Sequence, residues 1–158
     1  IVLTANQVQP LTKKTVAVVP AVTIPQGVVA LLSFDYEADF KTNARIMEKA
    51  LSGVRSIEIT RAVRSTKING LKIKRKQPIG LLDDDLVAAG DDNVDVINQV
   101  LTRIDLDKAE VVTIYYGADP EPTEAEQIGA SIKEQHPQLQ IEVIRGGQPH
   151  YSYIISVE

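Results

Sequence analysis

The order of predicted elements in the last third of the chain constrains the fold more than any other feature. A helical pattern over Asn93–Ile104 precedes the apolar run Glu110–Gly117, and a second helical pattern ends before Pro137. Two strand-like runs, Leu139–Gly147 and Tyr151–Glu158, close the chain. Strands joined through a helix pair in parallel, whereas strands joined by a short loop pair antiparallel. This order therefore predicts an α/β lobe with a mixed sheet.

Two hairpin signals lie in the middle of the chain, after a predicted strand at Ser56–Arg64. Asn69-Gly70 separates apolar residues of the segment Thr66–Ile73, a pattern typical of a type I′ turn. Asp83-Asp84-Asp85 separates two further apolar runs. Clustered carboxylates suit Mg²⁺, but consecutive side chains point in different directions and Asp is a common turn residue. We interpret these three residues as a turn.

The first residues have the composition of two buried strands, Ile1–Asn6 and Lys14–Pro20, with only Gln7–Lys13 between them. A parallel pair needs a crossover of about a dozen residues or more. Either the two strands pair antiparallel, or a segment near residues 6–7 is missing. The chain also begins without Met. We therefore expect a C-terminal fragment of a longer protein.

Two helices are predicted next. Thr23 and Gln26 have the spacing of a capping box, which starts a short buried helix through Phe34. Acidic residues between 35 and 39 open a second helix. Its apolar stripe, with the i, i+4, i+7, i+11 spacing of one helix face, is Phe40, Ala44, Met47 and Leu51. A further capping box, Thr123–Glu126, is predicted to start the last helix.

The fold class predicted from these elements is α/β, with the end of a Rossmann-like lobe followed by a second α/β lobe with a mixed sheet. We assign residues 1–35 to a partial N-terminal lobe and 36–158 to the C-terminal lobe. The change in pattern between them is near Asp35 or Gly53.

Composition limits the function. The formal net charge of −4 argues against nucleic acid as the main partner, and the basic run Lys72–Lys76 is interpreted as a solvated strand edge. The chain has no Cys, which excludes thiol catalysis and Cys-ligated zinc. It has no apolar span long enough for a transmembrane segment and no phosphate-binding loop motif. His136 is predicted to cap a helix, and neither it nor His150 has a catalytic partner nearby in the sequence. We therefore assign no catalytic residue, metal ligand or cofactor to this chain.

Two segments have the composition of ligand-binding loops. The turn Thr23–Gly27 places free amides at a helix N-terminus, where an anion is stabilised. The capping box uses two of these donors, so a working anion site and a purely structural turn both stay open. The loop from Arg145 to Tyr151 has two glycines and a proline, which suggests a shaped loop. The candidate ligand-binding residues are Thr23, Gln26, Gly27, Gly146, Gly147 and Gln148.

A second set of residues consists of candidate partner contacts, because Arg and Tyr are favoured anchors at protein interfaces. They are Arg61, Arg64, Tyr115, Tyr116, Tyr151 and Tyr153. Side chains alternate along a strand, so about half of the tyrosines are expected in the core.

Five segments together resemble a known family. They read TIPQG, AVRSTKINGLKIK, IGLLDDDLVAAGDD, VTIYYGAD and GGQPHYSYIISVE. In this order they are similar to the C-terminal region of bacterial dihydroxyacetone kinase-like proteins, the A-type subunits of fatty acid kinase. The resemblance covers nearly the whole chain.

The resemblance implies a DegV-like fold and a place in lipid metabolism and phospholipid synthesis in the cytoplasm. The family's A-type protein phosphorylates a fatty acid held by a separate DegV-like carrier protein. ATP and Mg²⁺ bind in an upstream kinase domain that lies outside this chain. By this resemblance the chain is a non-catalytic docking or regulatory domain. The alternative is a lipid- or anion-binding module that uses the cleft between its lobes.

Overall fold

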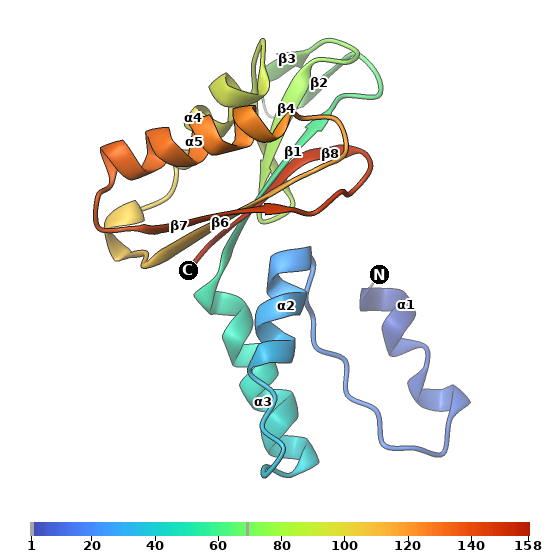
Figure 1. The fold of residues 1–158 in the computed structure, drawn as a ribbon. Coiled ribbons are helices and arrows are strands. Elements are labelled where there is room, and N and C mark those ends of the chain that lie inside the picture. The colour runs from blue at the N-terminus through green and yellow to red at the C-terminus, as the bar shows by residue number, and fades with distance from the viewer. Residues whose placement is uncertain (1, 69) are drawn as a thin grey trace. The chain divides into compact units, whose positions relative to one another are not determined.

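The computed structural model describes residues 2–68 and 70–158, and it divides the chain into two compact units, Ile1–Val54 and Arg55–Glu158. Each unit is described by itself (Figure 1). The division follows Gly53, one of the two positions where the sequence pattern changes. Helix α3 (Phe40–Ala50) packs against α2 (Ile24–Leu32) and thus belongs to the first unit.

The second unit is built on a mixed six-stranded sheet in the order β5-β4-β1-β8-β6-β7. The β6–β7 pair is parallel, and the other neighbouring strands of this sheet pair antiparallel. The expected α/β lobe with a mixed sheet is therefore confirmed. Its strands are β1 (Arg55–Arg61), β4 (Pro78–Leu82), β5 (Asp85–Ala89), β6 (Val111–Tyr116), β7 (Gln140–Arg145) and β8 (Tyr151–Val157).

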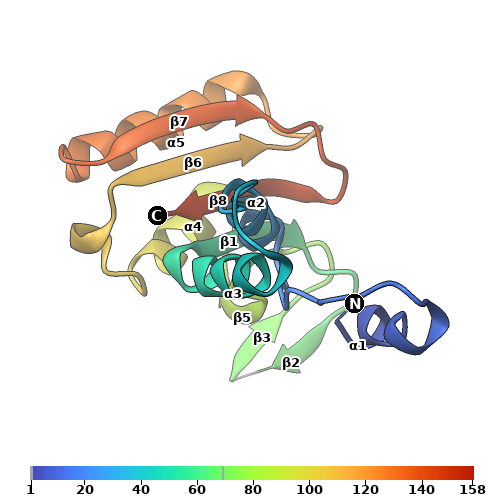
Figure 2. The same cartoon turned by 90° about the horizontal axis from the view of Figure 1, so that it is seen from below.

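Two helices cover one face of this sheet. Helix α4 (Asn93–Leu101) packs on β4, β1 and β5, and α5 (Pro122–Gln135) packs on β7 and β6. Figures 1 and 2 show both helices on the same side. The strand side chains that face them are apolar and close to fully buried, as are the inward residues of the helices. They form one continuous core that includes Ile57, Ile59, Val96, Val100, Val112, Ile114 and Ile155.

Both expected hairpins are present. Strands β4 and β5 are joined at Asp83 and Asp84, whose φ angles of 52° and 74° are left-handed, as a two-residue hairpin turn requires. Strands β2 (Thr66–Ile68) and β3 (Leu71–Ile73) form a separate two-stranded sheet. Gly70 has a φ of 82° in their turn, and Asn69 lies outside the described residues.

The first unit differs from the expectation. Val2–Asn6 is an α-helix (α1) and not a strand, and Lys14–Pro20 has no regular secondary structure. Among the described residues of this unit there is no β-strand, so the expected end of a Rossmann-like lobe is wrong here. A strand needs a neighbour for its backbone hydrogen bonds, and a β-branched run alone does not supply one. The missing segment near residues 6–7 was argued from that strand pair and stays a prediction.

The two longer helices of this unit begin as the sequence indicates. The Thr23 hydroxyl accepts a hydrogen bond from the Gln26 amide, and the Asp39 carboxylate caps α3 through the Thr42 amide. Between the helices, the buried Asn43 side chain bonds the backbone of Asp35 at both its amide and its carbonyl. Helix α2 is not the buried helix that was expected. Large apolar side chains in and next to it are exposed, namely Val22, Ile24, Val28, Leu31, Leu32 and Phe34.

The last helix begins earlier than its predicted capping box. Helix α5 starts at Pro122, its N-cap residue is Glu121, and that side chain makes no capping bond. Proline suits the first helical position because it has no amide hydrogen to satisfy there. The start is therefore set by Pro122, and the predicted cap at Thr123 is wrong. The C-terminal end is as expected, with His136 in the capping position before Pro137.

Candidate functional site

The carboxyl ends of the parallel strands β6 and β7 meet a shaped loop, residues 146–150. Such ends are the usual place for ligands in α/β sheets. Here the loop is held in place by hydrogen bonds to the backbone of β6. The amides of Gly146 and Gly147 both donate to the Tyr116 carbonyl, at 3.0 and 3.1 Å. The Gln148 side-chain amide donates to the Tyr115 carbonyl at 3.0 Å. These donors hold the loop on β6.

The backbone of this loop also passes very close to Gly117, the residue after β6. A Cβ atom at Gly117 would lie 2.2 Å from the Tyr151 carbonyl oxygen and 2.8 Å from that of Gln148. Only glycine allows this approach. A further bond of 2.6 Å runs from the Thr60 hydroxyl to the His150 carbonyl. The loop is therefore held rigidly at this end of the sheet.

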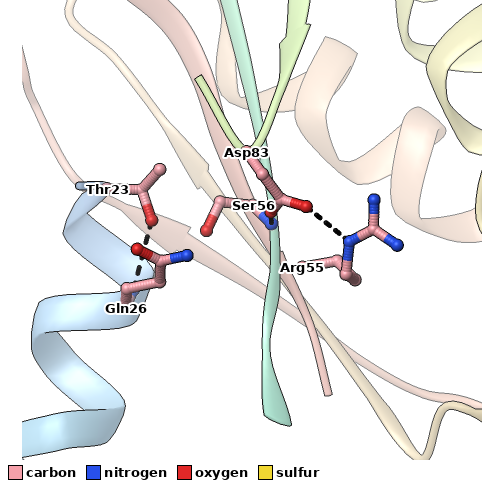
Figure 3. Close-up of polar contacts among 5 residues, drawn as sticks. All are labelled: Thr23, Gln26, Arg55, Ser56 and Asp83. Carbon is pink, nitrogen blue, oxygen red and sulfur yellow. Dashed lines mark hydrogen bonds and ion pairs between the residues drawn. The ribbon is translucent and has the colours of Figure 1, made fainter. Parts of the chain in front are cut away.

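The polar groups of the turn at Thr23 are likewise hydrogen-bonded to neighbouring residues of the chain. Its hydroxyl accepts from the Gln26 amide at 3.3 Å, a contact drawn in Figure 3. The Gln26 side-chain carbonyl accepts from the Val22 amide at 2.9 Å, one residue before the usual capping-box donor. The Gly27 amide donates to the Thr23 carbonyl at 3.1 Å. The hydrogen bonds of Thr23, Gln26 and Gly27 thus give each of these candidate ligand-binding residues a local structural role.

The six candidate ligand-binding residues belong to different units. Thr23, Gln26 and Gly27 lie in the first unit, and the loop Gly146–Gln148 lies in the second. Within each unit the structure brings the three neighbours together. A cleft with one group on each wall stays a prediction.

The candidate partner residues separate by burial. Tyr153 is 0% exposed, and its hydroxyl donates to Glu124 at 2.8 Å, so this side chain is part of the core and cannot contact a partner directly. Tyr116 packs partly buried against the same core, while Tyr115 and Tyr151 are half-buried. About half of the four tyrosines were expected in the core, but Tyr153 is the one that is fully buried, and Tyr151, two residues earlier on the same strand, is half-buried.

Arg61 and Tyr151 lie at the same end of the sheet. Thr60 pairs with Tyr151 across the β1–β8 ladder, and Arg61 is the next residue of β1. The exposed Arg61 donates to the Lys76 carbonyl at 3.3 Å. Arg64 is also exposed, in the loop that leads to β2. This end of the second unit therefore gathers Arg61, Tyr151 and the rigid loop before it.

Glu58 is a functional candidate that sequence reasoning missed. It lies on β1 between the buried Ile57 and Ile59 and is itself only 7% exposed. Its neighbours across the sheet are Leu81 and Ile154. Burial raises the pKa of the Glu58 carboxyl, and Asp84 raises it further. A lone charged residue within an apolar strand was the available signal.

Glu58 also affects a tyrosine in the partner set. Burial raises the pKa of the Tyr151 hydroxyl first, and the charges of Glu58 and Asp84 add to this effect. The pKa of Tyr115 is raised in the same way, by burial and then by Glu158 and Glu142. Both hydroxyls are therefore protonated hydrogen-bond donors at neutral pH.

Asp83 is a second residue whose role the sequence did not reveal. Figure 3 shows its carboxylate between Arg55 and Ser56. One oxygen pairs with the Arg55 guanidinium, and the other accepts from the Ser56 amide at 2.8 Å. This carboxylate fastens the β4–β5 turn to the start of β1.

Within residues 2–68 and 70–158, the structure contains no group of three or more His, Asp or Glu side chains arranged to hold a metal ion. None of the helices described there is long and apolar enough to span a membrane.

Comparison with known proteins agrees with the local sequence motifs. A family that comprises the C-terminal region of A-like subunits of fatty acid kinase (FakA-like) matches residues 1–158. The chain belongs to this family. The resemblance predicted from the five sequence segments is thereby confirmed.

Relatives of this FakA-like C-terminal region occur in bacteria. Protein YloV of Bacillus subtilis (strain 168) is 35% identical over 158 residues, which is all of this chain and 29% of YloV. A Staphylococcus aureus (strain MRSA252) protein named only as uncharacterized is 34% identical, with the same coverage. The chain thus spans less than a third of the length of these relatives.

Proposed function

We propose that this chain is the non-catalytic C-terminal docking region of a fatty acid kinase subunit. The family assignment supports the link to the kinase. One structural observation supports the docking role. The amides of Gly146 and Gly147 and the side chain of Gln148 are bonded to β6, so the loop is a rigid shaped surface with its donors in use. Such a surface suits recognition by shape better than the binding of a free anion.

The proposed partner is a separate DegV-like carrier that holds the fatty acid. The contact surface consists of the loop, Tyr151 and Arg61, which lie together at one end of the sheet. Arg64, Tyr115 and Tyr116 complete the candidate set. Tyrosine and arginine provide large contact areas and directed donors, which is why they dominate the binding energy of many interfaces.

The wider proposal concerns the parent protein. It is an ATP-dependent, cytoplasmic fatty acid kinase of lipid metabolism, and ATP and Mg²⁺ bind to a kinase domain upstream of this region. This region adopts a DegV-like arrangement. The chemistry of phosphoryl transfer is therefore assigned outside this chain.

The test is a binding measurement between the chain and the purified DegV-like carrier loaded with fatty acid. We expect Tyr151→Ala and Arg61→Ala each to weaken affinity by more than about 1 kcal/mol. Matched controls are Tyr36→Ala and Arg103→Ala, both of exposed residues outside the proposed surface. Equal affinity of all four variants would overturn the docking surface.

The alternative predicted from the sequence is a lipid- or anion-binding module that uses a cleft between the predicted lobes 1–35 and 36–158. Calorimetry with a fatty acid and with inorganic phosphate separates it from docking. If the chain binds either ligand and Thr23→Val abolishes that binding, the alternative replaces our proposal. Docking predicts no such ligand binding and an unchanged carrier affinity for Thr23→Val.

A further inference from the structure

A strongly basic surface surrounds the β2–β3 hairpin. Residues 59–82 contain no Asp or Glu, although the chain as a whole has a net charge of −4. The same stretch has seven of the 17 Lys and Arg residues, and all seven are exposed. We call these residues the basic hairpin: Arg61, Arg64, Lys67, Lys72, Lys74, Arg75 and Lys76.

The hairpin places like charges against each other. Lys67 lies directly opposite Lys72 in the β2–β3 ladder. A cross-strand pair of like charges is destabilising. Two-stranded hairpins are marginal by themselves, so this pairing is a cost in the free protein. An external negative surface would remove the repulsion.

No ion pair of the described residues neutralises this charge. Among the described residues the ion pairs are Arg55–Asp83 and Lys108–Asp105, and neither includes the basic hairpin. Strand β3 packs beside β5, which is flanked by acidic residues. Two of these are already engaged, because Asp83 binds Arg55 and Asp92 caps α4 through the Asp95 amide.

Apolar side chains are exposed among these cations. Val63 is 86% exposed, between Arg61 and Arg64 in sequence, and Ile68 is 43% exposed next to Lys67. Figure 2 shows the hairpin at the β5 end of the second unit, where it extends beyond the main sheet. Cations interspersed with aliphatic side chains on a projecting element can meet lipid headgroups and the outer part of the acyl layer together.

We propose that the basic hairpin binds the surface of an anionic lipid membrane. Lysine is depleted in protein interfaces, whereas Lys clusters are favoured on anionic lipid surfaces. Residues 59–82 contain no Phe, Tyr or Trp, the side chains that stack on nucleic-acid bases. The region thus holds the chain at a membrane peripherally. This inference does not depend on the carrier protein, although Arg61 and Arg64 belong to both proposed surfaces.

The test is co-sedimentation of the whole chain with vesicles. One set contains phosphatidylglycerol and phosphatidylcholine, and the other contains phosphatidylcholine alone. We expect binding to the first set only, and a loss of binding at high salt. Lys67→Glu/Lys72→Glu removes two cations from the surface and is expected to weaken binding at least about thirtyfold, at about 1 kcal/mol for each charge.

Two controls separate binding from folding. Lys41→Glu/Arg103→Glu makes the same charge change at exposed positions outside the hairpin and is expected to keep most of the binding. The single variant Lys67→Glu turns a repulsive cross-strand pair into an attractive one. It is therefore expected to melt no earlier than the wild type while it binds vesicles more weakly.

Three results would overturn the proposal. One is equal binding to both vesicle sets, and another is equal weakening by the hairpin and control variants. The third is binding to polyglutamate without binding to anionic vesicles, which would make the basic hairpin a site for an acidic protein.

Discussion

The two units of this chain use apolar residues in opposite ways. In the second unit, strands and helices from distant parts of the sequence enclose a continuous core in which Ile57, Val96 and Ile155 are 0% exposed. In the first unit, α2 has a more apolar sequence than α3, yet its Leu31 and Leu32 side chains are 70% and 79% exposed. The buried residues described in that unit are Thr23, Pro25, Ala30, Asn43 and Val54.

The difference teaches that apolar composition alone does not make a core. A sheet face with helices above it removes whole rows of side chains from water. Two helices joined by a short loop provide a single seam, and side chains outside that seam stay exposed. The first unit is therefore held mainly by local hydrogen bonds, and the second by long-range packing.

The largest effect that tests this contrast is expected from a core truncation. Ile57→Ala removes buried methylene groups that the neighbouring strands cannot replace, and it is expected to destabilise the second unit by about 3 kcal/mol. Leu32→Ala, at an exposed position of α2, is expected to change stability by less than about 0.5 kcal/mol. Urea denaturation of both variants measures the two costs. Similar costs would show that the two units do not differ in this way.

A smaller effect is expected at the rigid loop. Gly117→Ala would place a methyl group 2.2 Å from the Tyr151 carbonyl oxygen, so the loop must move. The expected cost is about 2 kcal/mol, the scale of overpacking. The matched control is Gly27→Ala in α2, where a Cβ meets no atom within 4 Å. If Gly117→Ala melts at the wild-type temperature, the loop is not rigid as described.

In the first unit the expected effects are local. Thr23→Val removes the hydroxyl that caps α2 and is expected to cost about 1 kcal/mol. Thr23→Ser keeps the hydroxyl and is expected to retain most of that stability. Circular dichroism during thermal unfolding checks both variants. A stable Thr23→Val variant would mean that the cap does not hold the helix start.

The smallest effect concerns the pH dependence of the second unit. Burial raises the pKa of Glu58 above its ordinary value of 4.5, so the folded state retains a proton that the unfolded state loses. Stability should therefore fall as the pH rises from about 4.5 through the raised pKa. Glu58→Gln removes this loss and is expected to stabilise the protein by roughly 1 kcal/mol at neutral pH and not at pH 4. Glu142→Gln, at an exposed position of β7, is the control. An equal gain at both pH values would contradict the assignment.

The contrast between the units also explains what could be predicted from the sequence. The hairpin at Asp83-Asp84 was predictable because its turn residues and flanking apolar runs agree. The helices after Asp92 and Glu121 were predictable from their spacing, apart from the exact start at Pro122. In these segments, local preference and long-range packing favour the same structure.

Where the two disagree, prediction failed. Lys14–Pro20 has the composition of a strand, but the first unit provides no sheet for it among the described residues. The loop at Gly146–Gln148 was correctly identified as shaped. Its inward bonds to Tyr115 and Tyr116 depend on the parallel alignment of β6 and β7, which no local motif encodes. The burial of Glu58 was not predicted, because charged side chains on a strand normally face the solvent.

The central claim is that long-range packing stabilises the second unit more than the first. Hydrogen exchange of the whole chain, followed by mass spectrometry, tests it most directly because amide protection reports local opening. We predict that amides of β1, β6 and β8 exchange several orders of magnitude more slowly than those of α2 and α3. Equal protection of α2, α3 and the central strands would contradict the claim.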